Sequence, residues 1–336
     1  MQRVCIIGMG PIGNRHARCY SDCDKAQLVG VCDINRERAE KAGKTYNVPY
    51  FTDAPTMLEA LKPDIVSVTT GGYEYSSDHY LPTMQAFEAG CHVLGEKPIS
   101  CDLRRAKEMI DTAKAYNLCY GIDMNHRFTP PARQCEKWMA DGRIGELLFC
   151  NMALWIGKFM PLDSPYYHIK ALNPHSVNIM QHFMGDVDEV NCFAYMAKGR
   201  DIYSTSSINM KFKCGAVGHL TSSYDIKRAH PMERCEVAGT NGRMVFEDMW
   251  RQATLYPAET MLKEEYTNPV FDGYRDFEDT FRCRIHTFVE QVDGGCKPEE
   301  IDGSGVEGYK AQQVIHAAIA SLKNGGAVVR VDEITE

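Results

Sequence analysis

Short apolar runs alternate with helix-like segments over the first 122 residues of the chain. Arg3–Ile7 and Ile65–Thr69 are strand-like runs, whereas the apolar residues of Asn35–Tyr46 recur at a helical spacing. Strands that alternate with helices indicate a doubly wound parallel α/β sheet. The same pattern predicts strands at Gln27–Cys32, Cys91–Leu94 and Cys119–Ile122, and helices at Asn14–Ser21, Pro55–Leu61, Thr83–Gly90 and Leu103–Tyr116.

The pattern changes at Asp123, where the alternation ends. Long β-rich runs then follow one another without intervening helices, which predicts an α+β domain with a large, mostly antiparallel open sheet. We therefore predict two domains, 1–123 and 124–336. The second has predicted strands at Glu146–Trp155, Val187–Met196, Thr205–Phe212, Ala216–Tyr224, Arg234–Ala238 and Met244–Phe246, and predicted helices at Ala132–Asp141, Arg275–Val292 and Val306–Leu322.

Composition and charge narrow the class of protein. A chain of 336 residues is long enough for two cores, and 44% hydrophobic with 24% charged residues is typical of a globular protein. The formal net charge of −8 disfavours nucleic acid or an anionic membrane as a partner. No apolar run is long enough for a membrane span, and the N-terminus opens into a strand rather than a signal peptide, so we expect a cytoplasmic protein.

The 14 cysteines are scattered along the chain and include no Cys-x-x-Cys pair. Most of them fall in apolar runs, so we expect reduced core residues rather than disulfides. Cys19 and Cys23 lie one helical turn apart, but a zinc ion needs two more ligands nearby. His168, His175 and His182 also lack a carboxylate partner in sequence. We therefore predict no metal site.

A glycine-rich segment follows the first predicted strand. Its sequence, Gly8-Met9-Gly10-Pro11-Ile12-Gly13, has the Gly-x-Gly-x-x-Gly pattern between a strand and a helix. The first glycine permits a tight turn, the second lets a pyrophosphate approach the backbone, and the third lets the helix pack on the strand. The phosphates then face the helix N-terminus. We predict a dinucleotide-binding site that includes Gly8, Gly10, Pro11, Ile12 and Gly13.

Asp33 ends the second predicted strand, in the place where dinucleotide-binding domains hold the ribose. A carboxylate there accepts hydrogen bonds from ribose hydroxyls and repels a 2′-phosphate, so we expect NAD as the cofactor. Arg36 and Arg38 lie close by in sequence and leave NADP as the less favoured alternative. Asp33 can also cap the following helix, a role that is compatible with ribose binding.

A loop opens at Thr70, directly after the strand that ends at Thr69. Its glycines allow close approach of a ligand to the backbone, and its tyrosines can stack on a ribose or sugar ring. We predict that Thr70 and His79 contact the cofactor and that Tyr73 contacts the substrate.

The segment Glu96-Lys97-Pro98 follows the strand predicted at Cys91–Leu94. Lys97 is therefore expected at the carboxyl end of a strand, where open α/β sheets bind ligands. Considered alone, Glu96 and Lys97 are more typical of an ion pair that caps a turn.

Four segments together resemble the Gfo/Idh/MocA (glucose–fructose oxidoreductase/inositol dehydrogenase) family of oxidoreductases. They are the glycine segment, Asp33, Gly95-Glu96-Lys97-Pro98 and Asn125-His126-Arg127-Phe128. The resemblance extends over nearly the whole chain and implies a Rossmann NAD-binding domain followed by an α+β substrate domain. In that family the lysine of Glu-Lys-Pro contacts the reacting oxygen, which reverses the interpretation of Lys97 as a simple ion pair. Glu96 and Lys97 are also expected to border the cofactor.

The family also has an Asp-x-Gly-x-His-x-x-Asp pattern at the start of a helix, which supplies further catalytic groups. Aligned backward from a later glycine, this pattern falls on Ala171–Asn178 and its histidine on His175. Ala171 and Asn178 replace the two aspartates, and Asn173 replaces the glycine. The resemblance thus implies a catalytic His175 whose orienting partner is not the family's aspartate.

Oxidation of a secondary alcohol requires transfer of a hydride to the cofactor and removal of the hydroxyl proton. We predict that Lys97 polarises the oxygen while His175 takes the proton. The two roles can be exchanged, because a desolvated lysine can also act as a base. Neutral polar groups near these residues suit the hydroxyls of a polyol. The predicted substrate-binding residues are Tyr73, Arg127, Trp155, Tyr166, His168, Asn173 and Asn178.

These residues predict an NAD-dependent dehydrogenase that oxidises a ring hydroxyl of a sugar or glycoside, with C3 as a candidate carbon. One alternative is an enzyme that keeps NAD bound and uses transient oxidation to cleave or epimerise a glycoside. Others are an inositol or polyol dehydrogenase and a non-catalytic sugar or NAD sensor. Because the predicted open sheet has too few helices to cover both faces, we also expect a homo-oligomer, a dimer, tetramer or larger.

Overall fold

The computed structural model describes residues 1–72, 78–100, 102–157, 164–227, 231–268 and 277–335. The chain divides into two compact units. Unit 1 contains Met1–Met124 and Phe281–Tyr309, and unit 2 contains Asn125–Thr280 and Lys310–Glu336. The sequence pattern indicates the first transition, near residue 123, but gives no sign that the chain returns to unit 1 at Phe281.

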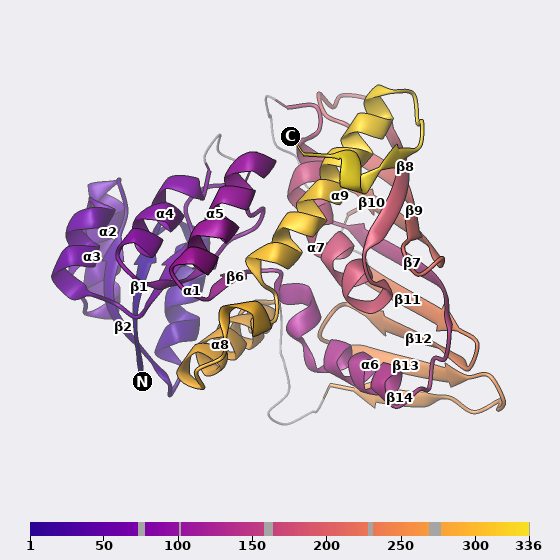
Figure 1. Ribbon diagram of the computed structural model, residues 1–336, viewed down its shortest axis with the longest axis horizontal. Helices are drawn as coiled ribbons and strands as arrows, with labels where there is room; N and C mark the ends of the chain where they lie inside the picture. Colours follow the sequence, from indigo (N-terminus) through magenta and orange to yellow (C-terminus); the bar gives the residue numbers. More distant parts are fainter. Residues whose placement is uncertain (73–77, 101, 158–163, 228–230, 269–276, 336) are drawn as a thin grey trace. The chain divides into compact units, whose positions relative to one another are not determined.

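Unit 1 is built on a six-stranded parallel sheet with the strand order β3-β2-β1-β4-β5-β6. This confirms the predicted doubly wound sheet, whose strands alternate with helices along the chain (Figure 1). The order of the strands reverses at β1 and β4, so the carboxyl ends of these two strands form the switch point where such sheets bind ligands. The strands are β1 (Gln2–Ile7), β2 (Ala26–Cys32), β3 (Tyr50–Phe51), β4 (Ile65–Val68), β5 (His92–Gly95) and β6 (Tyr120–Ile122).

Local sequence signals mark the starts of α1, α2, α3 and α5 in unit 1. Pro11 occupies the first turn of α1, where its missing N–H costs no hydrogen bond. The Asp102 side chain accepts hydrogen bonds from the backbone N–H groups of Arg104 and Arg105 at the start of α5. The helices are α1 (Pro11–Ser21), α2 (Arg36–Tyr46), α3 (Ala54–Leu61), α4 (Tyr80–Glu88) and α5 (Leu103–Ala115), with α8 (Glu278–Asp293) and the short η3 (Pro298–Glu300) from the later segment.

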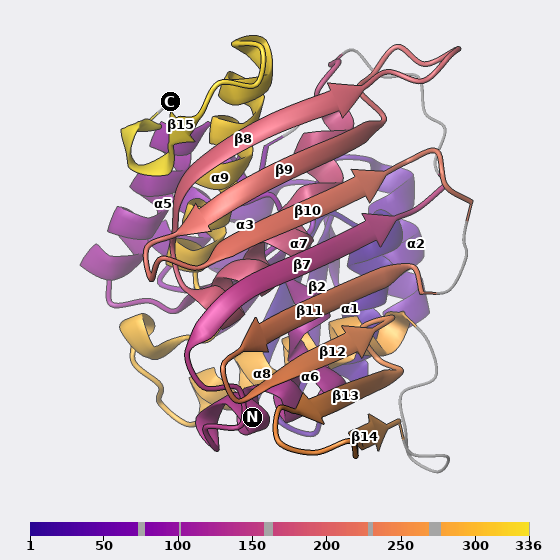
Figure 2. The same cartoon turned by 90° about the vertical axis from the view of Figure 1, so that its right-hand side faces the viewer.

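Unit 2 contains a nine-stranded sheet with the order β14-β13-β12-β11-β7-β10-β9-β8-β15 (Figure 2). The strands pair antiparallel except for β7 and β10, which confirms the predicted, mostly antiparallel sheet. The last three strands in chain order were not apparent from the sequence. The strands are β7 (Leu147–Trp155), β8 (Val187–Tyr195), β9 (Thr205–Phe212), β10 (Val217–Ser223), β11 (Glu233–Gly239), β12 (Gly242–Glu247), β13 (Gln252–Pro257), β14 (Glu264–Thr267) and β15 (Val329–Arg330).

Helix α7 (Tyr167–Met184) covers one face of this sheet, packed on β7, β9 and β10. Residues 167–169 and 171–180 are buried, and alternate residues of β7, such as Cys150, Met152 and Leu154, are buried on the sheet. Figure 2 looks at the opposite face, with α7 behind the strands. The remaining elements are η2 (Asn125–Phe128), α6 (Pro130–Ala140), η4 (Val331–Glu333) and α9 (Gly305–Lys323), which begins in unit 1 and ends in unit 2.

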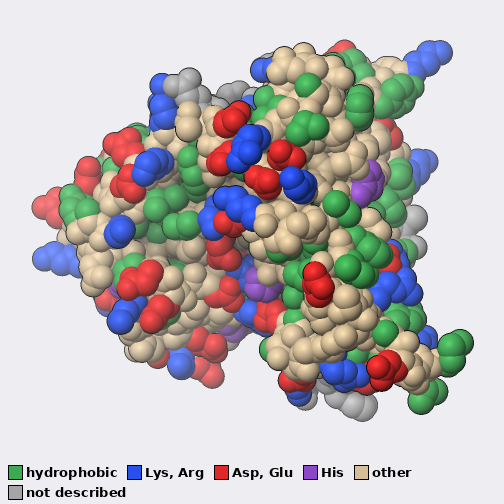
Figure 3. Space-filling view, turned by 45° about the vertical axis from the view of Figure 1, so that its right-hand side comes forward, with side chains coloured by type: hydrophobic (Ala, Val, Ile, Leu, Met, Phe, Trp, Pro, Cys, Tyr) green, Lys and Arg blue, Asp and Glu red, His purple; other side chains and the backbone are tan. Residues whose placement is uncertain are grey.

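The cysteines within the described ranges are all free thiols, and most of them are buried, as their apolar surroundings in the sequence predict. Within the same ranges, no helix combines the length and the apolar character needed to cross a membrane. Acidic and basic side chains are interspersed on the face shown in Figure 3, rather than gathered into one large basic area.

Candidate active site

The three glycines of the β1–α1 segment have the separate roles that the motif predicts. Gly8 has a positive φ of 102°, and a side chain there would collide with the backbone of Thr69 and Thr70. A side chain at Gly13 would collide with the carbonyl oxygen of Gly8, so the helix packs on the strand only with glycine. At Gly10 no atom lies within 4 Å of the position a Cβ would take. This open space lies at the N-terminus of α1 and fits a pyrophosphate.

Asp33 is held beside this glycine segment by two backbone hydrogen bonds. Its Oδ2 accepts from Met9 N at 2.7 Å, and its Oδ1 accepts from Asn35 N at 2.8 Å. Asn35, rather than Asp33, caps helix α2 through its own side chain. Each carboxylate oxygen keeps a lone pair for a ribose hydroxyl. The observed geometry therefore fits the adenosine ribose of a bound NAD molecule.

His79 connects two of the predicted cofactor-binding segments. Its Nδ1 lies 2.8 Å from the carbonyl oxygen of Pro98, and its Nε2 lies 3.1 Å from that of Thr70. The side chain is buried, with 2% exposure. His79 therefore fixes the positions of the segments that follow β4 and β5. Tyr73, predicted from the same loop, lies outside the described residues.

Lys97 lies at the carboxyl end of β5, as predicted, because that strand ends at Gly95. The segment is held by its neighbour: Glu96 N donates to Val68 O, and Lys97 N donates to Glu96 Oε2 at 3.2 Å. The Lys97 side chain is half-buried. The backbone that carries the ammonium group is thus fixed to the end of β4 while the side chain keeps some exposure.

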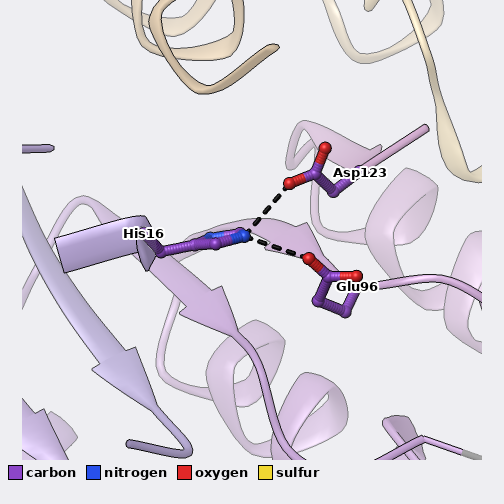
Figure 4. A group of neighbouring side chains, drawn as sticks. All are labelled: His16, Glu96 and Asp123. Carbon is purple, nitrogen blue, oxygen red and sulfur yellow. Dashed lines mark hydrogen bonds and ion pairs between the residues drawn. The ribbon is translucent and has the colours of Figure 1, made fainter. Parts of the chain in front are cut away.

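A buried histidine holds the other oxygen of Glu96 (Figure 4). His16 Nε2 lies 3.1 Å from Glu96 Oε1 and 3.0 Å from Asp123 Oδ2, and its Nδ1 lies 2.7 Å from Ser67 Oγ. The three side chains have the spacing of metal ligands. A protonated Nε2 donates a hydrogen bond to Glu96 and lies at ion-pair distance from Asp123, so a histidine cation also accounts for this arrangement.

The charges of this cluster depend on each other. Burial alone would lower the pKa of His16, but hydrogen bonds to Asp123 and Glu96 outweigh it and raise that pKa to about 9. Burial alone would raise the pKa of Glu96, but the hydrogen bond from His16 lowers it. Burial raises the pKa of Asp123. His16 is therefore a buried cation that keeps Glu96 ionised beneath Lys97.

In unit 2, His175 packs face to face against a second histidine. The rings of His126 and His175 are parallel within 2°, with their centroids 3.9 Å apart. His126 Nδ1 lies 3.0 Å from Glu233 Oε1. All three side chains are at least nine-tenths buried. Sequence analysis singled out the segment that contains His126 but gave no sign of Glu233, which lies 107 residues further along the chain.

Two of the predicted substrate residues are joined directly in unit 2. Arg127 Nε donates to Asn178 Oδ1 at 3.1 Å, and both side chains are buried. Asn178 lies almost one turn after His175 on α7, so the two share a face of the helix. On the same helix, Asn173 Nδ2 donates to Ser206 Oγ at 3.3 Å.

The other predicted substrate residues have different surroundings. His168 is fully buried with its ring 4.8 Å from that of Tyr224, and burial lowers its pKa to about 3. It is a neutral core histidine. Tyr166 stacks on Tyr203, and Trp155 is half-buried at the end of β7.

Comparisons with known proteins identify the family of the chain. A family model for the oxidoreductase family with an NAD-binding Rossmann fold matches residues 2–124, and one for the GFO/IDH/MocA C-terminal domain matches residues 132–245. The chain is 37% identical to D-glucoside 3-dehydrogenase of Escherichia coli (strain K12) over 97% of each chain. It is 25% identical to myo-inositol 2-dehydrogenase of Thermotoga maritima over 99% of each chain.

Among solved structures, levoglucosan dehydrogenase in complex with NADH and levoglucosan has the same fold. The TM-score is 0.86 at 18% sequence identity, and the match covers 98% of this chain and 99% of that one. The matches to both family domains, together with the glycine segment and Asp33, show that the chain belongs to the Gfo/Idh/MocA family and is an NAD-dependent oxidoreductase.

Proposed function

We propose that the protein oxidises the C3 hydroxyl of a glucoside to a ketone, with NAD as the hydride acceptor. The observation that carries this proposal is the 37% identity to D-glucoside 3-dehydrogenase over 97% of both chains. Identity to the inositol dehydrogenase is lower, at 25%. The amide and imidazole groups of α7 are neutral donors and acceptors, which suit sugar hydroxyls better than a charged substrate.

In this proposal, Lys97 and His175 have different roles at the substrate hydroxyl. The Lys97 ammonium group donates a hydrogen bond to the reacting oxygen and stabilises the negative charge that develops there. His175 takes the hydroxyl proton, so the O–H bond breaks as an N–H bond forms. When NAD is bound, it accepts the hydride that leaves the carbon, and a C=O double bond results.

Gly8, Gly10, Pro11, Ile12 and Gly13 hold the pyrophosphate of NAD in the same proposal, and Asp33 holds the adenosine ribose. Thr70, His79 and Glu96 shape the wall beside Lys97. Arg127, Asn173 and Asn178 orient sugar hydroxyls, and Trp155 and Tyr166 offer aromatic faces to the ring. An inositol is the second candidate substrate, because the similarity to myo-inositol 2-dehydrogenase also covers 99% of the chain.

A substrate panel tests the proposal. The purified protein is mixed with NAD and methyl β-glucoside, levoglucosan or myo-inositol, and both NADH and the position of the new carbonyl are measured. We expect NADH and a 3-keto glucoside. Fastest turnover of myo-inositol would reject the proposed substrate. A keto sugar without free NADH, together with NAD retained on the purified protein, would indicate the cycling mechanism instead.

Replacement of Lys97 tests the role of its charge. Lys97→Met keeps most of the side-chain volume and removes the ammonium group, so we expect kcat to fall about a hundredfold to a thousandfold. Lys107→Met is the matched control, because Lys107 lies on the surface of the same unit, paired with Asp111. Equal activity of both variants would reject the role of Lys97.

We also propose that the protein is a homo-oligomer assembled through the open face of the nine-stranded sheet. That face carries the exposed side chains of Phe193 and Tyr195 beside a hydrogen-bonded row of Asn191, Asn209 and His219. An apolar and polar mixture of this kind is usual at subunit interfaces. Light scattering should give a mass of at least twice 37.9 kDa, the mass of one chain. A sample that contains only the 37.9 kDa monomer would reject the assembly.

A further inference from the structure

Helix α7 offers His175 no negative charge of its own. None of its residues from Tyr167 to Met184 is an aspartate or glutamate. A proton on a buried imidazole is costly unless an opposite charge lies nearby. A histidine that takes a proton during the reaction therefore needs a counter-charge from another element.

Glu233 of β11 is placed to supply that charge through His126. Its carboxylate is fully buried and accepts a hydrogen bond from His126 Nδ1. Within the described ranges, His126 Nε2 and Glu233 Oε2 are buried without a hydrogen-bond partner. The described residues therefore show one hydrogen bond for this pair, in which Nδ1 donates to Oε1 and the second carboxylate oxygen receives none.

The stacked rings bring the Glu233 carboxylate close to His175. Glu233 binds the edge of the His126 ring, and His175 lies on the face of the same ring, with the ring centroids 3.9 Å apart. A buried site with little water transmits such a charge more strongly than solvent does. The parallel planes, within 2°, also restrict rotation of the His175 ring. Phe277 packs edge-on against His126 at 5.6 Å and supports it from another side.

We propose that Glu233 and His126 are positioning residues for His175: Glu233 stabilises the proton that His175 accepts, and His126 fixes the plane of its ring. This inference rests on the proposed function, in which His175 takes the hydroxyl proton. The carboxylate favours the protonated state, which forms as the substrate hydroxyl loses its proton, and so it lowers the barrier rather than strengthening substrate binding.

Other charged groups around α7 act differently. Arg127 of η2 is buried and bonded to Asn178, and its positive charge opposes a proton on His175. Lys170, His168 and His182 lie on α7 itself. Glu136 of α6 binds His182, which lies two helical turns after His175, at 2.7 Å. It also binds Arg133 at 2.9 Å. Among the contacts given above for the described residues, Glu233 is the carboxylate joined to His175 through a stacked ring.

Glu233→Gln tests the inference, because the amide keeps the size and still accepts a hydrogen bond from His126. In protein labelled with ¹⁵N-histidine, we expect the titration midpoint of His175 to move to lower pH by about one unit. We expect kcat to fall about tenfold to a hundredfold with KM nearly unchanged, and the acid limb of the kcat profile to move in the same direction.

Glu136→Gln is the matched control, since it removes the carboxylate that pairs with His182 on the same helix and should leave the His175 titration unchanged. If Glu233→Gln fails to fold, the double variant H126F/E233L keeps an aromatic face and removes both polar partners, and the same shift is expected. An unchanged His175 titration in the folded variant overturns the inference. Because the titration needs no turnover, it decides the matter even if the wild type oxidises no glucoside and the proposed function fails.

Discussion

His16 in unit 1 and His168 in unit 2 are both completely buried, yet their surroundings make the first a cation and leave the second neutral. His16 lies between two carboxylates, which raise its pKa to about 9 against the effect of burial. His168 packs on Tyr224, and burial lowers its pKa to about 3. Burial thus disfavours the protonated form of both histidines. Hydrogen-bonded carboxylates decide whether that form is nevertheless stable.

His175 has a third kind of surroundings. It stacks on His126, whose Nδ1 binds the carboxylate of Glu233. A permanent cation such as His16 cannot take a proton at neutral pH, and a histidine as strongly shifted as His168 holds one poorly. A general base must do both, and the proposal assigns that balance to the pair of His126 and Glu233.

The largest expected effect is on stability in acid. The unfolded chain binds a proton on His168 below its ordinary pKa of 6.5, whereas the folded chain does so only near pH 3. The free energy of unfolding should therefore fall as the pH drops from 6.5 to 3, by up to about 5 kcal/mol from this residue. In His168→Phe this part of the loss should vanish. Urea unfolding of both proteins at several pH values measures the difference, and identical slopes would contradict a neutral His168.

The next effect comes from removal of the buried cation. His16→Leu leaves Glu96 and Asp123 buried without their shared proton donor, so we expect a loss of about 3–5 kcal/mol of unfolding free energy at pH 7. His182→Gln is the control, because its pair with Glu136 is partly exposed, and should cost about 1 kcal/mol or less. Equal losses in urea unfolding would mean that the His16 cluster carries no special charge.

Sequence reasoning succeeded where the relevant partners are close in the chain. The roles of Gly8, Gly10 and Gly13 follow from a six-residue spacing, and the position of Lys97 follows from the end of a short strand. Both depend on local backbone geometry, which a motif describes fully.

It failed where the partners are distant. His16 and Glu96 are 80 residues apart, and His126 and Glu233 are 107 apart. Nothing in the spacing of either pair predicts their contact, because it arises only when elements far apart in the chain pack together. Strand β13 and the edge strand β14 were missed for a related reason: their short, mixed sequences become strands by pairing with β12 and with each other.

The most direct test of the proposed reaction follows the hydrogen itself. Methyl β-glucoside carrying deuterium at C3 is oxidised with NAD, and the mass of the NADH formed is measured beside that from substrate deuterated at C2. The proposal predicts that deuterium enters NADH from C3 and not from C2, with a 3-keto glucoside as the other product. Deuterium that arrives from C2, or that remains in the sugar while NADH forms, would contradict it.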